Sequence, residues 1–248
     1  MILLDNYKDV LDYYANTPAN MVDKQQYKYD AGTSFELDIN DTIIKNFGSF
    51  FLYWQIKFSF HTFFNWTVNL SLNNIFTNQL NNQNSNDTDV SFLFKDKNNM
   101  FTIDHMIVTP YAVFILEAKN HKAQTKYKSE LHKWHIINEK KIINIINNPV
   151  LQVLKYKTVV STFMSYYKIN LPIIPKVIFK QQVNLDDITD NEKKLCIYPC
   201  DLSKLIHTSK KDNIFQPNEA LKFAKILFYY GCHPIAYDDN KINWSVSK

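Results

Sequence analysis

A set of two acids and one lysine stands at the ends of two neighbouring apolar segments. Asp104 precedes the first segment, and Glu117 and Lys119 end the second. Mg²⁺ prefers oxygen ligands, keeps several waters, and needs only one or two carboxylates besides a substrate phosphate. A bound Mg²⁺ polarises a phosphoryl oxygen and activates a water, and a nearby lysine can orient that water or stabilise developing negative charge. These residue types could therefore hydrolyse a phosphodiester.

The two apolar segments are expected to form a β-hairpin. The runs 106–108 and 113–116 are rich in β-branched and aromatic residues, and the four residues between them include a proline that suits a turn. In an antiparallel pair the start of one strand meets the end of the other, so Asp104 should lie beside Glu117. Glu117 and Lys119, two residues apart, should point to the same face. Pattern alone also allows a simple salt bridge at a strand end, which is common and weak.

The composition bounds the class of protein. The chain has 248 residues, of which 46% are hydrophobic and 21% charged, as in a globular protein with one sizeable domain. Its net charge of +4 rests on lysine, because the sequence contains no arginine. Lysine can neutralise phosphates, whereas bidentate reading of base edges is typical of arginine. The charge therefore permits a nucleic-acid partner without requiring one. The absence of a glycine-rich phosphate loop excludes a P-loop ATPase.

The N-terminus and the cysteines favour a cytoplasmic protein. Met1–Leu4 is followed at once by Asp5, unlike a signal peptide, and no apolar run reaches the roughly 18 residues of a spanning helix. The cysteines are an odd number, Cys196, Cys200 and Cys232, which favours reduced thiols. We therefore expect a cytoplasmic location and no membrane partner.

Periodicity and turn residues predict the remaining elements of an α/β chain. Before the hairpin we expect an amphipathic helix and a polar connector within 1–30, and then a turn at 31–34. A helix at 35–47, with Glu36 in its first turn, and a strand at 54–61 should follow. The remaining expected elements are an apolar piece at 66–76, an exposed Asn-rich loop within 73–89 and a strand at 90–94. After the hairpin we expect strands at 134–137 and 142–146, a helix from Pro149 to Tyr167 capped by Asn148, strands at 176–179 and 195–198, a small helix from Asp201 through Ile206, a helix from Asn218 to Tyr230 and an irregular tail.

The ordered set of motifs resembles the nuclease-related (NERD) domain, a family of the PD-(D/E)xK nuclease superfamily. The family pattern runs from an Ile-Asp-His-like start through two apolar strands to Glu-x-Lys-Asn, and the matching residues are Ile103-Asp104-His105 and Glu117-Ala118-Lys119-Asn120. Further matches follow in the family's order: Trp134, the helix start Asn148-Pro149-Val150-Leu151-Gln152 and the apolar strand 174–179. Upstream, Gly32-Thr33-Ser34-Phe35-Glu36 looks like the family's opening Gly-x-x-x-Glu.

The resemblance implies a fold and a domain organisation. The fold is a restriction-endonuclease-like α/β core in which a central mixed β-sheet is flanked by helices. The resemblance covers about residues 31–207, which would form the nuclease-like domain. Residues 1–30 would then be an N-terminal helical extension, and residues 208–248 a C-terminal helix and tail packed on the same domain.

The resemblance also implies roles for the charged set. Asp104 and Glu117 would bind Mg²⁺ or Mn²⁺, with the Ala118 carbonyl as an extra ligand, and Lys119 would position the attacking water. Glu36 would reach the metal from the first helix. For Glu36 a second reading stays open, because an acid in the first turn also complements the helix dipole.

Two residues of the later helix complete the expected site. Gln152 and Tyr156 form Gln-x-x-x-Tyr, one helical turn apart and hence on one face. In RecB-like members of the superfamily such a pair lies at the active site, which implies a catalytic role for Gln152 and a supporting one for Tyr156. An ordinary half-buried helix face would show the same spacing.

These features predict a metal-dependent nuclease that hydrolyses phosphodiester bonds by attack of a metal-activated water. From the resemblance we expect DNA rather than RNA as its substrate. The alternative is a non-catalytic module that keeps the fold and binds nucleic acid or supports an assembly.

Overall fold

The computed structural model describes residues 2–3, 24–46, 50–59, 100–130, 132–138, 141–229, 232 and 234–238. The chain divides into two compact units, Met1–Ile56 with Ile103–Lys248, and Lys57–Thr102. The elements expected at 66–76, 73–89 and 90–94 lie outside the described residues, as does most of the expected N-terminal helix. None of the helices in the described ranges has an apolar stretch long enough to span a membrane.

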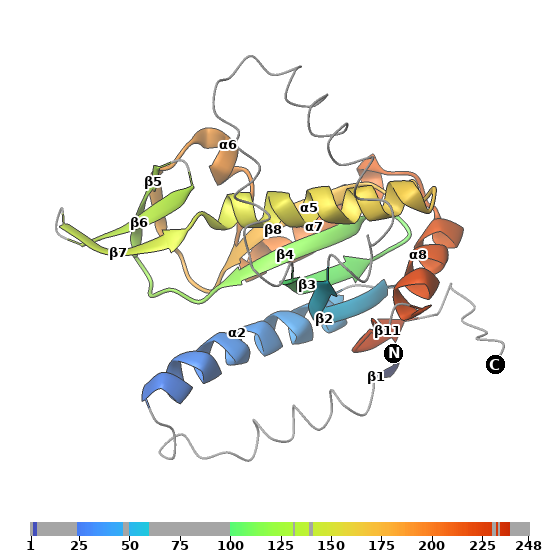
Figure 1. Ribbon diagram of the computed structural model, residues 1–248, viewed down its shortest axis with the longest axis horizontal. Coiled ribbons are helices and arrows are strands. Elements are labelled where there is room, and N and C mark those ends of the chain that lie inside the picture. The colour runs from blue at the N-terminus through green and yellow to red at the C-terminus, as the bar shows by residue number, and fades with distance from the viewer. Residues whose placement is uncertain are drawn as a thin grey trace. The chain divides into compact units, whose positions relative to one another are not determined.

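A mixed β-sheet forms the centre of the larger unit (Figure 1). In the described part of the chain it has seven strands in the order β1-β11-β2-β3-β4-β8-β10. Their bounds in that order are Ile2–Leu3, Ala236–Asp238, Phe50–Ser59, Met100–Val108, Val113–Lys119, Ile173–Phe179 and Cys196–Ile197. β4 pairs antiparallel with β3 and parallel with β8. The predicted α/β fold with a mixed sheet is confirmed.

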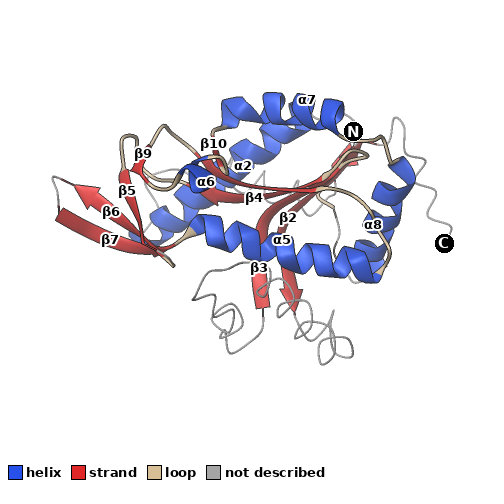
Figure 2. Cartoon of the chain, turned by 90° about the horizontal axis from the view of Figure 1, so that it is seen from above, coloured by secondary structure: helices blue, strands red, loops and turns tan. Residues whose placement is uncertain are grey.

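Helices cover both faces of this sheet, as Figure 2 shows. On one side lie α2 (Lys24–Asn46) and α7 (Leu202–Asp212), and on the other lies α5 (Pro149–Tyr166). The chain reaches α5 from β4 through a small sheet and then returns as β8, parallel to β4. A parallel pair needs such a crossover connection.

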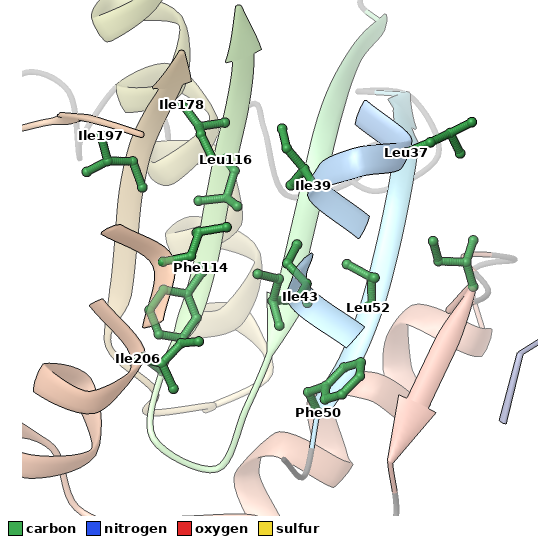
Figure 3. Packing of buried hydrophobic residues seen from close by; sticks show 14 of the residues in the cluster. Leu37, Ile39, Ile43, Phe50, Leu52, Phe114, Leu116, Ile178, Ile197 and Ile206 are labelled. Atoms are coloured by element: carbon green, nitrogen blue, oxygen red, sulfur yellow. The ribbon is translucent and has the colours of Figure 1, made fainter. Parts of the chain in front are cut away.

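The core beneath α2 and α7 is formed by alternate residues of the central strands (Figure 3). Phe114 and Leu116 of β4 are buried there because successive strand residues point to opposite faces. The helix α2 contributes residues four apart, which is the spacing of one helix face. They are Phe35, Ile39 and Ile43, all buried. The helix predicted at 35–47 is thus confirmed as part of α2.

A second, smaller sheet carries the connection between β4 and α5. Its strand order is β7-β6-β5-β9, with bounds Lys141–Asn147, Lys133–Asn138, Lys126–Glu130 and Asn184–Asp187. Three rings join it to the end of β8: Tyr127 lies 5.3 Å from Trp134 and 5.8 Å from Phe179, measured between ring centroids. The predicted strands at 134–137 and 142–146 are confirmed. β5 and β9 were not predicted, because their polar sequences lack the apolar alternation of a strand.

The first helix corrects one prediction, because α2 runs unbroken from Lys24 to Asn46. The turn expected at 31–34 is therefore wrong, and residues 24–30 are helical rather than a connector. A single glycine inside a helix costs only about 1 kcal/mol. Burial of Thr33 and Phe35 on either side of Ser34 outweighs that local preference.

The chain termini correct two more predictions. Ile2–Leu3 is a strand rather than part of a helix, and Ala236–Asp238 is a strand rather than an irregular tail. They pair with each other, Ile2 opposite Tyr237, and Ala236–Asp238 also pairs with Phe50–Leu52 of β2. Partners so distant in sequence leave no local pattern from which the pairing could be predicted.

β8 begins at Ile173, three residues earlier than predicted, and contains Pro175. Val177 directs its N–H away from β4, to the Leu195 carbonyl of the β10 side at 2.8 Å. Pro175 lies two residues earlier in the strand, so its backbone nitrogen faces the same side as that of Val177. β10, however, pairs only with Val177 and Ile178. The missing N–H of the proline therefore faces a position beyond the end of β10, and no ladder bond is lost.

The C-terminal helices agree with the prediction except at one cap. The final helix, predicted from Asn218 to Tyr230, is confirmed as α8 (Pro217–Tyr229). The small helix predicted to end at Ile206 continues to Asp212 as α7. It follows a 3₁₀ turn, η2 (Pro199–Asp201), and Asp201 does not cap it. The Asp201 carboxylate instead accepts the N–H of Tyr198 at 2.9 Å.

The start of α5, which carries two of the expected site residues, is fixed by a network around Glu192 of α6 (Asp190–Lys193). Asn148 caps α5 as predicted, accepting the N–H of Val150 at 2.9 Å. Glu192 Oε1 in turn accepts the Asn148 side-chain amide at 2.8 Å, the Ser129 hydroxyl at 2.8 Å and the Trp134 indole at 3.1 Å. One carboxylate thus ties the cap of α5 to the small sheet.

We predict that Glu192→Ala lowers the free energy of unfolding by about 2 kcal/mol or more, because it leaves these donors without an acceptor. Burial raises the pKa of Glu192, but the hydrogen bonds it accepts lower that pKa overall. The stability that the ionised Glu192 carboxylate contributes should therefore be fully present above the usual glutamate pKa of about 4.3. It should disappear as the pH falls through the lower pKa that Glu192 has in the folded protein.

Urea unfolding from pH 7 to pH 3 measures this effect. Glu130→Ala is the control, because Glu130 is an exposed acid of the same sheet paired with Lys128. Its loss should change stability far less than the loss of Glu192, because exposed ion pairs contribute little. Equal losses for the two variants would contradict the role of the Glu192 network.

Candidate active site

The β3–β4 hairpin has the predicted turn and register. The Thr109 N–H donates to the Ala112 carbonyl at 3.0 Å, and the Thr109 hydroxyl oxygen accepts the Ala112 N–H at 3.0 Å. Across the strands His105 lies opposite Leu116 and Val108 opposite Val113. The next residues outward are Asp104 and Glu117, so the hairpin brings the two carboxylates together at its open end.

Three charged side chains meet at this end of the hairpin. Asp104 Oδ2 accepts the backbone N–H of Ala118 at 2.8 Å. Lys119 Nζ forms an ion pair with Glu117 Oε1, as expected for residues two apart on one strand. Glu117 is only 2% exposed, and its other oxygen, Oε2, is buried without a hydrogen-bond partner among the described residues. A buried carboxylate oxygen in this state is costly unless a cation or donor reaches it.

Burial and neighbouring negative charge raise the pKa of both carboxylates of the hairpin. Burial, the charge of Glu117 and the charge of Glu36 raise the pKa of Asp104 to about 8, against the Ala118 N–H and Lys119, which lower it. Burial also raises the pKa of Glu117; Lys119 and the Gln152 amide oppose this, and the charge of Glu36 adds to it. If all three acids were ionised, they would therefore carry more negative charge than the Lys119 ammonium neutralises.

Two residues of α5 lie against these carboxylates. Gln152 donates its side-chain N–H to the Tyr156 hydroxyl at 2.8 Å. Tyr156 is 4% exposed, and burial together with the charges of Glu117 and Asp104 raises its pKa. Gln152 is close enough to Glu117 to lower the pKa of that carboxyl. The predicted Gln-x-x-x-Tyr face is thus directed at the acids.

Glu36 of α2 is the third carboxylate near this point, since its charge raises the pKa of both Asp104 and Glu117. Its Oε2 accepts the Trp54 indole N–H at 2.7 Å and the Gln55 side-chain amide at 2.9 Å. Adjacent residues of a regular strand point to opposite faces. Gln55 has a positive φ of 48°, and this break in β2 allows both neighbours to reach one oxygen.

His105, the neighbour of Asp104 on β3, points to the other face of the sheet and connects the hairpin to α2. Its Nε2 lies 3.1 Å from the Glu36 carbonyl oxygen, and because a carbonyl only accepts, Nε2 carries the hydrogen. Burial lowers the pKa of His105 to about 4, although the bond to Glu36 opposes that shift. His105 is therefore neutral near pH 7 and orders the backbone of Glu36, as expected for a structural histidine.

The sequence did not identify Trp54 and Gln55 as site residues. The alternation from Trp54 to His61 predicts a half-buried strand, and the part of it that the structure describes is a strand. A positive φ at a glutamine leaves no sequence signal, so the convergence on Glu36 could not be predicted.

The carboxylates do not form a ready-made cage for a metal. Across the described residues, no group of three or more His, Cys, Asp and Glu side chains is arranged to hold an ion. One oxygen of Glu36 is already engaged by Trp54 and Gln55. The side chains that could hold an ion at this point are therefore Asp104 and Glu117, and other oxygen atoms would have to complete its coordination.

Comparison with known families places this site within a described domain. Residues 69–180 match the family model of the nuclease-related domain (NERD), a span of less than half the chain. Asp104, Glu117, Lys119, Gln152 and Tyr156 all lie inside the matched span, whereas Glu36 lies outside it. Searches among curated proteins and among solved structures found no match.

The matched span begins later and ends earlier than the resemblance at about 31–207, but it includes the whole hairpin and the start of α5. The mixed sheet with helices on both faces is consistent with the PD-(D/E)xK superfamily to which that domain is assigned. The chain therefore contains a nuclease-related domain of the NERD family.

Proposed function

We propose that this protein is a nuclease that hydrolyses phosphodiester bonds with the help of a divalent cation, Mg²⁺ or Mn²⁺. We further propose that it acts on DNA rather than RNA. The observation that carries the proposal is the convergence of Asp104, Glu117 and Lys119 at one end of a buried hairpin within the matched nuclease-related domain.

The residues present fit a divalent cation. Glu117 Oε2 is buried without a partner in the described part of the chain, and the pKa of Asp104 is raised to about 8. Both observations are typical of acids that lack a neutralising cation. Mg²⁺ keeps several waters, so two carboxylates and a substrate phosphate are enough. Asp104 and Glu117 would therefore hold the ion without a larger cage of side chains.

The Ala118 backbone supports the same set. Its N–H donates to Asp104 Oδ2, and the N–H and C=O of one strand residue point to the same side. The Ala118 carbonyl is thus directed toward Asp104 and could add an uncharged oxygen ligand.

Lys119 would act on the reacting water and phosphate. A bound divalent cation would neutralise phosphate charge and make a water more acidic. Lys119 lies beside Glu117, where its ammonium would orient the attacking water or stabilise the negative charge that develops on the phosphoryl oxygens.

Gln152 and Tyr156 would position Glu117. The bond between their side chains at 2.8 Å fixes the Gln152 amide beside Glu117, and the buried Tyr156 ring excludes water from this side. Glu36 would add negative charge that attracts the cation, held in place by Trp54 and Gln55.

We predict that Lys119→Ala lowers the cleavage rate by about 100-fold or more, because it removes the group that stabilises developing charge. Metal affinity should not fall, because the ammonium competes with the cation for Glu117. The assay compares the cleavage of linear, circular and single-stranded DNA and of RNA, each in the presence of Mg²⁺ or Mn²⁺. Lys122→Ala, which removes an exposed lysine of the following loop, is the control. Identical cleavage by wild type and Lys119→Ala would exclude the catalytic role.

We predict that Asp104→Asn weakens Mn²⁺ binding at least about tenfold in calorimetric titration. In the wild type a proton competes with the metal below the Asp104 pKa of about 8. Affinity should therefore rise with pH up to about 8, and binding should release a proton, seen in buffers with different heats of ionisation. Asp104→Asn should lose both effects. Asp38→Asn, which changes an acid that is 65% exposed, should keep them. An unchanged affinity in Asp104→Asn would reject Asp104 as a ligand.

We predict that Trp54→Phe, which keeps a ring but removes the indole donor to Glu36, weakens metal binding about tenfold. The loss should act through Glu36. Glu36→Gln should therefore give a similar loss, and adding Trp54→Phe to that variant should cost little more. Full additivity of the two changes would show that Trp54 acts independently of Glu36, and no loss in Glu36→Gln would remove Glu36 from the site.

A further inference from the structure

The outer strand of the small sheet, β7, presents apolar side chains to solvent. It forms one edge of the sheet, and Figure 1 shows it with β6 as a ribbon extending from the start of α5. Ile142, Ile143 and Ile145 are 54%, 63% and 54% exposed. Exposed edge strands rich in β-branched residues are templates for pairing with another chain.

The two edges of this sheet differ in protection. The edge strand β9 carries Asp186 and Asp187, and charges on an edge prevent pairing. β7, with the sequence Lys-Ile-Ile-Asn-Ile-Ile-Asn, has a single charge at its first residue and no proline. Nothing in its sequence opposes a further strand beside Ile142–Ile146.

The sequence of β7 identifies the partner that fits it. The five residues Ile142-Ile143-Asn144-Ile145-Ile146 read the same in both directions. When such a strand is paired antiparallel with itself about Asn144, isoleucine faces isoleucine at all four outer positions. A two-fold interface has this self-complementarity. In this register Lys141 lies opposite Asn147 of the second copy, so no like charges meet.

We infer that β7 pairs antiparallel with β7 of a second copy of this chain, about a two-fold axis at Asn144, and joins two small sheets into one. Ile143 opposes Ile145 of the second copy, and Ile142 opposes Ile146. In β6 no residue pairs with Ile143, because the register shifts between Ile136 and Ile137. The most exposed isoleucine of the strand therefore gains its cross-strand partner only in the dimer.

The edge backbone agrees with this arrangement. The N–H of Ile145 donates to the side-chain oxygen of Asn144 at 2.8 Å. An edge donor satisfied by a neighbouring side chain can exchange that oxygen for a carbonyl of an added strand. A nucleic acid fits this surface less well, because phosphate binding depends on several cationic groups and the strand offers one lysine.

Sedimentation of the full chain over a range of concentrations tests the inference. A seven-residue edge buries less than the roughly 1,200 Å² of a stable interface, so the dimer should be weak and form at micromolar concentrations. The mass should rise from 29.3 kDa toward twice that value. Ile143→Lys should weaken dimerisation at least tenfold, because both copies then bury a lysine at the interface.

Ile214→Lys is the matched control, since Ile214 is 78% exposed and lies outside the sheets. A wild-type protein that stays monomeric up to several hundred micromolar would overturn the inference. Equal weakening by both lysine variants would also overturn it, as would a case in which Ile143→Lys changes DNA binding and leaves the mass unchanged.

A cross-link tests the register. Residues opposite each other in an antiparallel pair have Cα atoms about 4.5 or 5.5 Å apart, within the range of disulfides. In a Cys200→Ser background, which removes an exposed thiol, Asn144→Cys should form a disulfide-linked dimer on oxidation. Asn147→Cys should not, because its opposite residue is Lys141. Cross-linking of Asn147→Cys alone, or of both variants equally, would contradict the axis at Asn144.

Discussion

The burial of Asp104 and Glu117 side by side is the constraint on which the rest of this structure depends. Two ionised carboxylates at the end of a hairpin repel each other, and burial raises the pKa of both. Neither acid stabilises the fold when it is buried and ionised. The hairpin is instead held by the apolar pairing of β3 with β4 and by the threonine-centred turn at its closed end. The acids occupy positions that the sheet would fill more stably with apolar residues.

The groups around the acids reduce this repulsion without removing it. The Ala118 N–H and Lys119 favour the charged form of Asp104, and Lys119 and Gln152 favour that of Glu117. Glu36 acts in the opposite direction on both. A fold selected for stability alone has no use for a third acid at this point. Its placement by two hydrogen bonds from β2 is more readily explained by a need for negative charge, as expected of a site for a cation.

How much of this could be predicted depends on the distance along the chain over which each interaction acts. The hairpin and α5 were predicted because their signals are local: two apolar runs around a proline, and an asparagine followed by a proline at a helix start. The turn expected at 31–34 was wrong because a local glycine signal was outweighed by burial in α2. The contacts of Glu36 with Trp54, and of Glu192 with Asn148, join segments that share no pattern. The roles of the site residues and the proposed domain bounds remain predictions.

The packing that positions β4 extends beyond the residues that match the nuclease-related domain. The matched span ends with β8 and begins after β2, so it lacks both α2 and α7. Phe114 and Leu116 of β4 are buried against those helices and would otherwise face water. The strand that ends in Glu117 and Lys119 would then lose the packing on one face that fixes its position. Exposure of two such side chains costs about 3 to 6 kcal/mol, a large share of the stability of an average domain. The same helix α2 supplies Glu36, so the element that covers the sheet also carries the acid whose charge raises the pKa of Asp104 and Glu117.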